Sequence, residues 1–236
     1  TYPTGGAPAL SDISFALGHG KTLGIIGGTG SGKSTLISLI PRFYDVTDGA
    51  VKVDGCDVKD FPLQTLRGKI GLVPQKALLF LGTIRDNLLW GNENAPDEEL
   101  YEALRAAQAL EVVEGKPKGL DDPVETGGRN FSGGQRQRLT IARALVRRPE
   151  LLILDDSASA LDFATDAALR RALRELPWHP AVVIFSQRTA SIRFADEILV
   201  LDDGRLAGKG THDELLETCE VYREIYESQF KKEDAR

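Results

Sequence analysis

The stretch that decides the fold is residues 27–35, which read Gly-Gly-Thr-Gly-Ser-Gly-Lys-Ser-Thr. It fits the phosphate-binding loop pattern G-x-x-x-x-G-K-[ST] and lies between two apolar runs, 23–26 and 36–40. These runs predict a strand before the loop and a helix after it. Glycines without a Cβ let backbone N–H groups approach phosphate oxygens closely. We therefore expect a strand–loop–helix unit that holds phosphate groups.

The loop offers distinct contacts to a phosphorylated ligand. The Lys33 ammonium would reach the β- and γ-phosphates, and the Ser34 hydroxyl would ligate Mg²⁺. The helix that begins near Lys33 would turn its positive end toward the same anion. A glycine-rich turn that binds nothing is the alternative, and the flanking strand and helix disfavour it. The predicted binding set is Gly27, Gly28, Thr29, Gly30, Ser31, Gly32, Lys33, Ser34 and Thr35.

Composition places the chain among globular proteins. Its 236 residues are enough for one large domain or two small ones, and 42% of them are hydrophobic. The net charge of −6 argues against a nucleic-acid-binding surface as the main function. The apolar runs are far shorter than a membrane span, and no signal-peptide pattern opens the chain.

Cysteine and methionine usage adds two expectations. Cys56 and Cys219 have no metal-ligand spacing, so we interpret them as reduced, structural residues of a cytosolic protein. Methionine is absent, even at position 1. We therefore expect the sequence to be a piece of a longer protein.

Alternation and turn residues predict the remaining strands. Residues 10–17 alternate and predict a strand, and residues 50–53 followed by Asp54-Gly55 predict a strand that enters a hairpin. A short buried strand is predicted over 70–73, and Gln75 follows it. The Gln75 amide oxygen could ligate Mg²⁺ or orient water at a nucleotide, or Gln75 could be an ordinary loop residue.

The middle of the chain predicts loops and helices. Residues 76–96 are apolar yet irregular, so they form either a partner surface or a loop packed on its own domain. A helix is predicted to start at 96–99, and its apolar stripe continues to Leu110.

A second anion-binding geometry is predicted where Phe131-Ser132-Gly133-Gly134-Gln135 precedes a helix over 136–148. Ser132 is a natural N-cap, and Gly133 and Gly134 expose backbone N–H groups at the positive end of this helix. A plain helix cap would explain the same residues.

Acidic and polar residues end two further apolar strands. The strand predicted over 151–154 delivers Asp155 and Asp156 at its carboxyl end, where ligands bind in open α/β sheets. The first acid suits Mg²⁺, and a surface acidic turn is the alternative. The strand predicted over 181–185 is followed by Gln187.

The order and spacing of these segments resemble one family. The segments are residues 27–35, Gln75, FSGGQ at 131–135, LLILDD at 151–156 and SALD at 159–162. From Tyr2 to about Gln229, the chain is similar to the nucleotide-binding domain of an exporter-type ABC transporter. This implies a single ABC ATPase domain of the α/β class, with a RecA-like phosphate-loop NTPase core and an antiparallel β lobe. A helical lobe would complete it. We expect the core and β lobe over about 1–75 and 150–236, and the helical lobe over about 76–149.

The resemblance also implies roles for individual residues. Tyr2 would stack on the adenine of ATP, the alternative being a frayed terminal tyrosine. Gln75 would sense Mg²⁺ and the transmembrane domain, and Asp155 would coordinate Mg²⁺. Ser132, Gly133, Gly134 and Gln135 would contact the γ-phosphate held by a partner domain.

The resemblance implies contacts with other domains. Two such domains sandwich two ATP molecules head to tail, and residues 159–162 would cross their interface. The loop over 76–90 would meet the coupling helices of a transmembrane domain, and Glu125 would do likewise. The domain would then lie at the cytoplasmic face of the cell membrane.

Two positions depart from the family pattern. The residue after the Mg²⁺-binding acid is usually Glu, which polarises the attacking water, and here it is Asp156. A carboxylate set back by one methylene can cost about a hundredfold in rate. The switch position usually holds His, and here it is Gln187, whose amide carries no charge.

These departures predict an ABC-type ATPase of low intrinsic activity, one half of a heterodimeric exporter with a degenerate ATP site. It would bind ATP and Mg²⁺ tightly, hydrolyse ATP slowly through Asp156, Gln187 and Gln75, and complete the active site of a non-identical partner. An alternative is drift without consequence, in which Asp156 still serves as a slow base. Two other functions are a non-hydrolysing, ATP-gated dimerisation or regulatory module and a soluble ABC ATPase of repair or translation. The acidic charge disfavours the last.

Overall fold

The computed structural model describes residues 6–157 and 159–233, with side chains up to Gln229. It divides into two compact units, the first formed by Thr1–Arg67 with Ala181–Arg236 and the second by Gly68–Pro180. The lobe boundaries expected above remain predictions.

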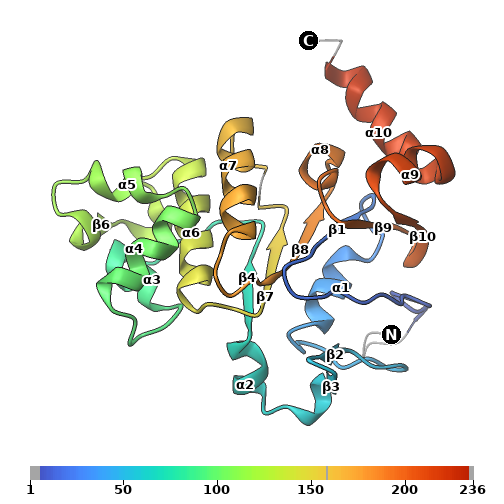
Figure 1. Cartoon of the computed structure of the whole chain (residues 1–236), viewed down its shortest axis with the longest axis horizontal. Helices are drawn as coiled ribbons and strands as arrows, with labels where there is room; N and C mark the ends of the chain where they lie inside the picture. Colours follow the sequence, from blue (N-terminus) through green and yellow to red (C-terminus); the bar gives the residue numbers. More distant parts are fainter. Residues whose placement is uncertain (1–5, 158, 234–236) are drawn as a thin grey trace. The chain divides into compact units, whose positions relative to one another are not determined.

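The first unit is built on a mixed sheet with the strand order β10-β9-β1-β8 (Figure 1). Strand β1 pairs in parallel with β8 and with β9, whereas β10 pairs antiparallel with β9. The elements of this unit, in chain order, are β1 (Thr22–Ile26), α1 (Lys33–Leu39), β2 (Lys52–Val53), β3 (Cys56–Asp57), η1 (Val58–Asp60), α2 (Leu63–Gly68, ending at the unit boundary), β8 (Ala181–Ser186), α8 (Thr189–Ile192), β9 (Glu197–Asp202), β10 (Arg205–Gly210), α9 (His212–Thr218) and α10 (Glu220–Glu233).

Apolar runs and turn chemistry explain this sheet. Strand β8 is buried along its whole length, as are the last four residues of β1, which is typical of parallel strands covered on both faces. Asp203 and Gly204 take positive φ values of 42° and 73° in the β9–β10 turn. Asp54 and Gly55 do the same between β2 and β3, so the hairpin predicted at Asp54-Gly55 is confirmed.

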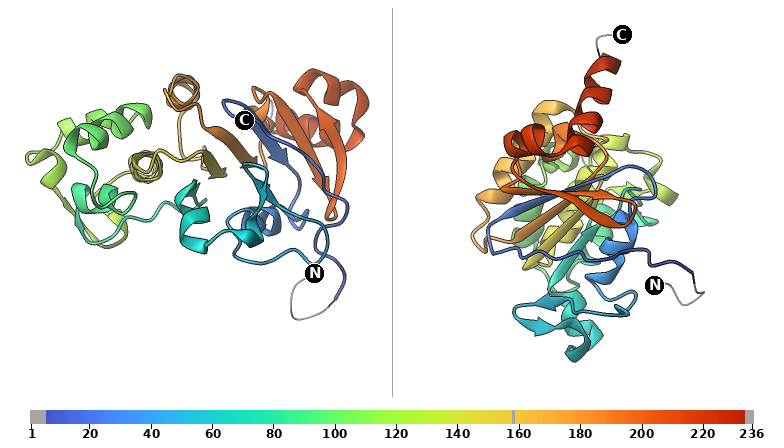
Figure 2. Two further views of the ribbon diagram at one scale, coloured as in Figure 1. Left: turned by 60° about the horizontal axis from the view of Figure 1, so that its bottom comes forward. Right: turned by 90° about the vertical axis from the view of Figure 1, so that its right-hand side faces the viewer.

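The second unit combines a parallel strand pair with a helical cluster (Figure 2). Helix α6 packs against α3 and α4, and buries Leu139, Ile141, Ala142 and Leu145. The elements are β4 (Ile70–Val73), β5 (Gly82–Thr83), α3 (Ile84–Leu89), α4 (Asp97–Ala106), α5 (Leu110–Glu114), η2 (Gly119–Asp121), β6 (Pro123–Val124), η3 (Thr126–Gly128), α6 (Gly133–Val146), β7 (Leu151–Asp155) and α7 (Phe163–Arg174).

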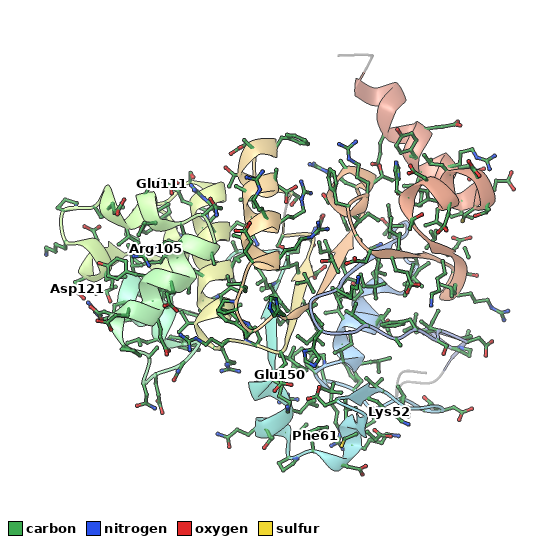
Figure 3. All side chains as sticks on the ribbon, in the orientation of Figure 1. Lys52, Phe61, Arg105, Glu111, Asp121 and Glu150 are labelled. Atoms are coloured by element: carbon green, nitrogen blue, oxygen red, sulfur yellow. The ribbon has the colours of Figure 1, made fainter. Side chains whose placement is uncertain are left out.

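An ion pair marks the amino ends of the two parallel strands in this unit. Lys69, which precedes β4, donates from Nζ to Oε1 of Glu150 at 2.7 Å. Glu150, which Figure 3 labels, precedes β7. The strands pair from Ile70 with Leu151 to Val73 with Leu154. Their carboxyl ends therefore lie together at the opposite edge.

Three local expectations were wrong. Residues 10–17 form no strand, because Asp12 takes a φ of 57° that breaks the extended backbone. The helix expected to continue to Leu110 ends at Ala106, and Gln108 turns the chain with a φ of 56°. The apolar segment expected to be irregular contains α3, which starts with a capping box formed by the N-cap Thr83.

Within the described residues, none of the helices has both the length and the apolar character that crossing a membrane requires.

Helices α9 and α10 meet through a buried phenol. Tyr222 is fully buried, and its hydroxyl lies 2.7 Å from Nδ1 of His212. Burial raises the pKa of Tyr222 from 10.0 to about 12. The neutral phenol is thus favoured in the folded protein.

We expect the free energy of unfolding to fall as the pH rises from 10 to 12, because the unfolded chain loses the Tyr222 proton first. The loss should be about 2 kcal/mol, measured by urea unfolding across this range. Tyr222→Phe should remove this loss, whereas Tyr101→Phe, in the other unit, should keep it. An unchanged alkaline loss in Tyr222→Phe would contradict the assignment.

Candidate functional site

The loop between β1 and α1 folds around the side chain of Lys33. The Lys33 ammonium donates to the carbonyl oxygens of Gly27 at 2.5 Å and Gly28 at 2.9 Å, and to Oγ of Ser31 at 3.3 Å. These contacts hold the positive charge inside the curve of the loop, and the predicted contact of Lys33 with phosphate stays a prediction.

The glycines of this loop are required for different reasons. A Cβ on Gly27 would lie 2.3 Å from the carbonyl oxygen of Leu201, so packing excludes any side chain there. Gly30 and Gly32 take φ values of 85° and 98°, which favour glycine. Gly28 has neither constraint, since a Cβ there would meet nothing within 4 Å. Open space beside the backbone, next to an ammonium, fits a phosphate group.

The first turn of α1 supports the same assignment. Helix α1 begins at Lys33, and its N-cap Gly32 has no side chain that could cap the turn. Ser34, in this turn, is exposed and offers a hydroxyl of the kind that ligates Mg²⁺. Thr29 and Gly30 are also exposed, so the loop presents an accessible surface.

The second predicted anion-binding segment forms a complete capping box at the start of α6. Gln135 N donates to Ser132 Oγ at 3.2 Å, and Ser132 N donates to Gln135 Oε1 at 2.9 Å. A hydroxyl that accepts such a bond can still donate its own proton. Gly133 is exposed, and a Cβ there would find only Arg136 Nη2, at 4.0 Å. The fold itself therefore does not require glycine at position 133.

The carboxyl ends of β4 and β7 bring two predicted residues together. Gln75 Nε2 donates to Asp156 Oδ2 at 3.3 Å, although the two are far apart in sequence. Asp156 takes a φ of 44°, and its carbonyl accepts from Ser159 N at 3.2 Å and Ser159 Oγ at 2.8 Å. Asp155 ends β7 beside it.

Asp162 is the N-cap of α7. Its carboxylate accepts from Thr165 N at 2.9 Å and from Thr165 Oγ1 at 2.7 Å. These hydrogen bonds from Thr165 lower the pKa of Asp162. The end of the stretch expected to cross a dimer interface is thus fixed as a helix cap.

The switch position follows β8. Gln187 is exposed, and its carbonyl oxygen accepts from Gln229 Nε2 of α10 at 2.7 Å. Sequence patterns do not point to Gln229, because this contact joins residues on separate elements.

The segment over 76–90 packs inward and also exposes large side chains. Leu79 and Leu88 are buried, whereas Leu81 is 76% exposed and Trp90 is 65% exposed. The rings of Phe80 and Trp90 stack with centroids 4.4 Å apart. The packed-loop alternative therefore holds for part of this segment, and the partner surface stays a prediction.

Two residues that the sequence did not single out support this exposed surface. Buried Asn87 accepts from Phe80 N at 2.7 Å and donates to Phe80 O at 2.8 Å, which holds the loop before α3. The Arg143 guanidinium lies 5.4 Å from the centroid of the Phe80 ring, and burial lowers its pKa.

The remaining predicted contacts join parts that are described separately. Tyr2 lies outside the described residues. Lys33 and Ser34 belong to the first unit, whereas Asp155 and Gln75 belong to the second. Joint ligation of Mg²⁺ by Ser34, Gln75 and Asp155 therefore stays a prediction.

Comparisons with known proteins agree with this geometry. Residues 10–159 match the family described as ABC transporter. The chain is 47% identical over 232 residues to YfiB of Bacillus subtilis, named an uncharacterized ABC transporter ATP-binding protein, covering 98% of this chain and 40% of that protein. It is 43% identical to an ATP-dependent lipid A-core flippase of Chromobacterium violaceum, covering 99% of this chain and 40% of the flippase.

A solved structure shares the fold. It is the structure of a bacterial Atm1-family ABC exporter with ATP bound, with a TM-score of 0.88 and 36% identity, covering 94% of this chain and 39% of that one. The fold is therefore the ABC ATPase fold, an α/β fold with parallel and antiparallel strands. The chain spans about two fifths of the length of these relatives, 40% for the two sequences and 39% for the structure.

Adjacent glycines of the phosphate loop should respond differently to alanine. Gly27→Ala should lower the free energy of unfolding by about 3 kcal/mol, because its Cβ would overlap the Leu201 carbonyl oxygen. Gly28→Ala should change it by less than about 1 kcal/mol, since its Cβ meets open space. Urea unfolding of both variants measures the difference. Equal destabilisation would contradict the packing described here.

Proposed function

We propose that this chain, which belongs to the ABC transporter family, holds Mg-ATP for long periods at its own phosphate loop and completes the active site of a second, non-identical ATP-binding domain. The ATP-driven pair would power export through a transmembrane domain. The observation that carries this proposal is a phosphate loop that curves around Lys33, combined with departures from the family pattern at Asp156 and Gln187.

The residues present fit Mg-ATP. Lys33 would contact the β- and γ-phosphates, the backbone beside Gly28 would approach the phosphate oxygens, and Ser34 and Asp155 would ligate the metal. Bound Mg²⁺ neutralises charge on the phosphates. The chain's own task at this site would be to orient the nucleotide, with Tyr2 against the adenine ring.

The position and length of Asp156 support slow hydrolysis. Its carboxylate accepts a hydrogen bond from Gln75 Nε2 at 3.3 Å. One methylene fewer than in Glu leaves this base short of the water that it would polarise, and such a displacement can cost about a hundredfold in rate. A bond to Gln75 further directs the carboxylate toward β4.

The switch position weakens the same step. A histidine can carry a positive charge beside the phosphate, whereas the amide of Gln187 can only hydrogen-bond a phosphate oxygen. Binding needs the hydrogen bond, and fast hydrolysis needs the charge. Gln187 would therefore favour retention of ATP over its cleavage.

The segment over 132–135 would act on a nucleotide held by the partner. Ser132 keeps a hydroxyl proton to donate, and Gly133 leaves room for a phosphate beside the start of α6. Because this segment matches the family pattern, the site that it completes would be the fast one. The two domains would meet head to tail.

The exposed apolar surface formed by Leu78, Phe80, Leu81 and Trp90 would receive the coupling helices of the transmembrane domain. Large exposed apolar groups on adjoining loops are typical of a partner surface. The domain would then lie at the cytoplasmic face of a membrane.

The same altered residues favour a second candidate function, an ATP-gated dimerisation or regulatory module that does not hydrolyse ATP. The two differ in whether this site turns over at all once the partner is present. The substitutions below separate them.

The double substitution Asp156→Glu with Gln187→His should raise the single-turnover rate at this site by about tenfold to a hundredfold, because it restores the carboxylate reach and the switch charge. The measurement is ATP cleavage by the assembled pair with the partner's own phosphate loop disabled. Adding Lys33→Ala should abolish the gain. No gain in the double variant would sink the degenerate-site proposal.

Gly133→Ala should leave the free energy of unfolding within about 0.5 kcal/mol, because its Cβ meets open space. It should nevertheless weaken ATP-dependent pairing with the partner at least tenfold, since the methyl group would occupy the space needed by the γ-phosphate. Gly68→Ala, whose Cβ meets nothing within 4 Å, is the matched control. Sedimentation with ATP measures pairing, and normal pairing by Gly133→Ala would refute this role of the segment.

A further inference from the structure

The side chain of Gln229, on α10, holds both ends of the switch segment 187–189. Its Oε1 accepts from Thr189 N and from Thr189 Oγ1, each at 3.0 Å. Its Nε2 donates to the carbonyl oxygen of Gln187 at 2.7 Å. Both atoms of one amide are thus committed to a segment that starts 42 residues earlier.

The Gln229 side-chain amide caps the start of helix α8. Helix α8 starts at Thr189, and its own N-cap, Arg188, makes no side-chain capping bond. Gln229 satisfies the Thr189 N–H instead, and Thr189 is buried. The Arg188 N–H is taken by Ser186 Oγ at 2.9 Å. The backbone on either side of Arg188 is therefore held from two directions.

Helix α10 is itself anchored, so it can hold the segment in place. Tyr222 lies two helical turns before Gln229, on the same face, and is fully buried against His212. Arg223 donates from Nε to Leu216 O at 2.9 Å and from Nη2 to Glu217 O at 3.0 Å. These contacts fix the start of α10 on α9.

We propose that Gln229 is a positioning residue that aims the Gln187 side chain at the terminal phosphate of the bound nucleotide. This inference rests on the proposed function, in which Gln187 hydrogen-bonds that phosphate. The Gln187 side chain leaves a backbone whose carbonyl is fixed by Gln229 and whose next amide is fixed by Ser186. Loss of the Gln229 amide would let this backbone move, and the Gln187 side chain would then no longer be held in one direction.

A first experiment needs no nucleotide. Amide hydrogen exchange at Thr189 in the full chain should be at least about tenfold faster in Gln229→Ala than in the natural chain, because one buried hydrogen bond is lost. Gln229→Glu keeps an acceptor for Thr189 but loses the donor to Gln187 O, so Thr189 should stay protected. Ser228→Ala is the control, since Ser228 Oγ bonds Ile225 O within its own helix.

A second experiment measures how long nucleotide stays on the assembled protein. Both Gln229→Ala and Gln229→Glu should release ATP about tenfold faster, because the hydrogen bond from Gln187 to a charged phosphate is lost. ADP lacks the terminal phosphate, so its release should change less than about twofold. In a Gln187→Ala background, adding Gln229→Ala should have no further effect on ATP release.

The outcomes separate the two proposals. If Gln229→Ala accelerates Thr189 exchange but leaves the retention of ATP unchanged, the positioning role is overturned and the proposed long retention of ATP stands. Equal acceleration of ATP and ADP release, or additive effects of the two substitutions, indicates a merely structural role and also overturns it. A natural chain that retains no ATP overturns the proposed function and this inference together.

Discussion

The ammonium of Lys33, bonded to the carbonyl oxygens of Gly27 and Gly28, is the interaction on which the site depends. It ties the end of β1 to the start of α1 and gives the loop its curvature. Gly27 fits because the Leu201 carbonyl oxygen, from β9, leaves no room for a side chain. Packing against β9 therefore constrains which residues the loop can hold, in addition to the loop's own hydrogen bonds.

Binding and hydrolysis place different demands on this fold. Binding phosphate needs a curved backbone, a cation and space, all of which the loop over 27–35 supplies. Hydrolysis needs one carboxylate and one charged switch residue at defined positions, and a single methylene decides whether the carboxylate reaches. Under the proposed function the two demands fall on separate residues, so changes at Asp156 and Gln187 would alter hydrolysis and leave the binding loop unchanged.

The sequence predicted correctly those features that depend on residues close together in the chain. The loop over 27–35, the hairpin turn at Asp54-Gly55 and the N-cap at Ser132 follow from residues that are close in sequence. The strand expected over 10–17 does not form, because Asp12 takes a left-handed conformation although the residues around it alternate.

Contacts between segments that are distant in sequence could not be predicted in this way. Gln75 meets Asp156 because β4 and β7 run in parallel, and parallel pairing places both carboxyl ends at one edge. The strands themselves were predicted, but not their pairing. The role of Gln229 could not be predicted for a similar reason, because its side chain hydrogen-bonds a backbone carbonyl and a hydroxyl outside its own helix.

The fate of ATP bound at this chain's own loop tests the account most directly. The assembled pair is loaded with ATP labelled on its γ-phosphate, chased with unlabelled ATP, and quenched at intervals to separate intact ATP from released phosphate. The account predicts that labelled ATP stays intact at this site while the pair completes several rounds of hydrolysis. Cleavage of that label within a single round would contradict it.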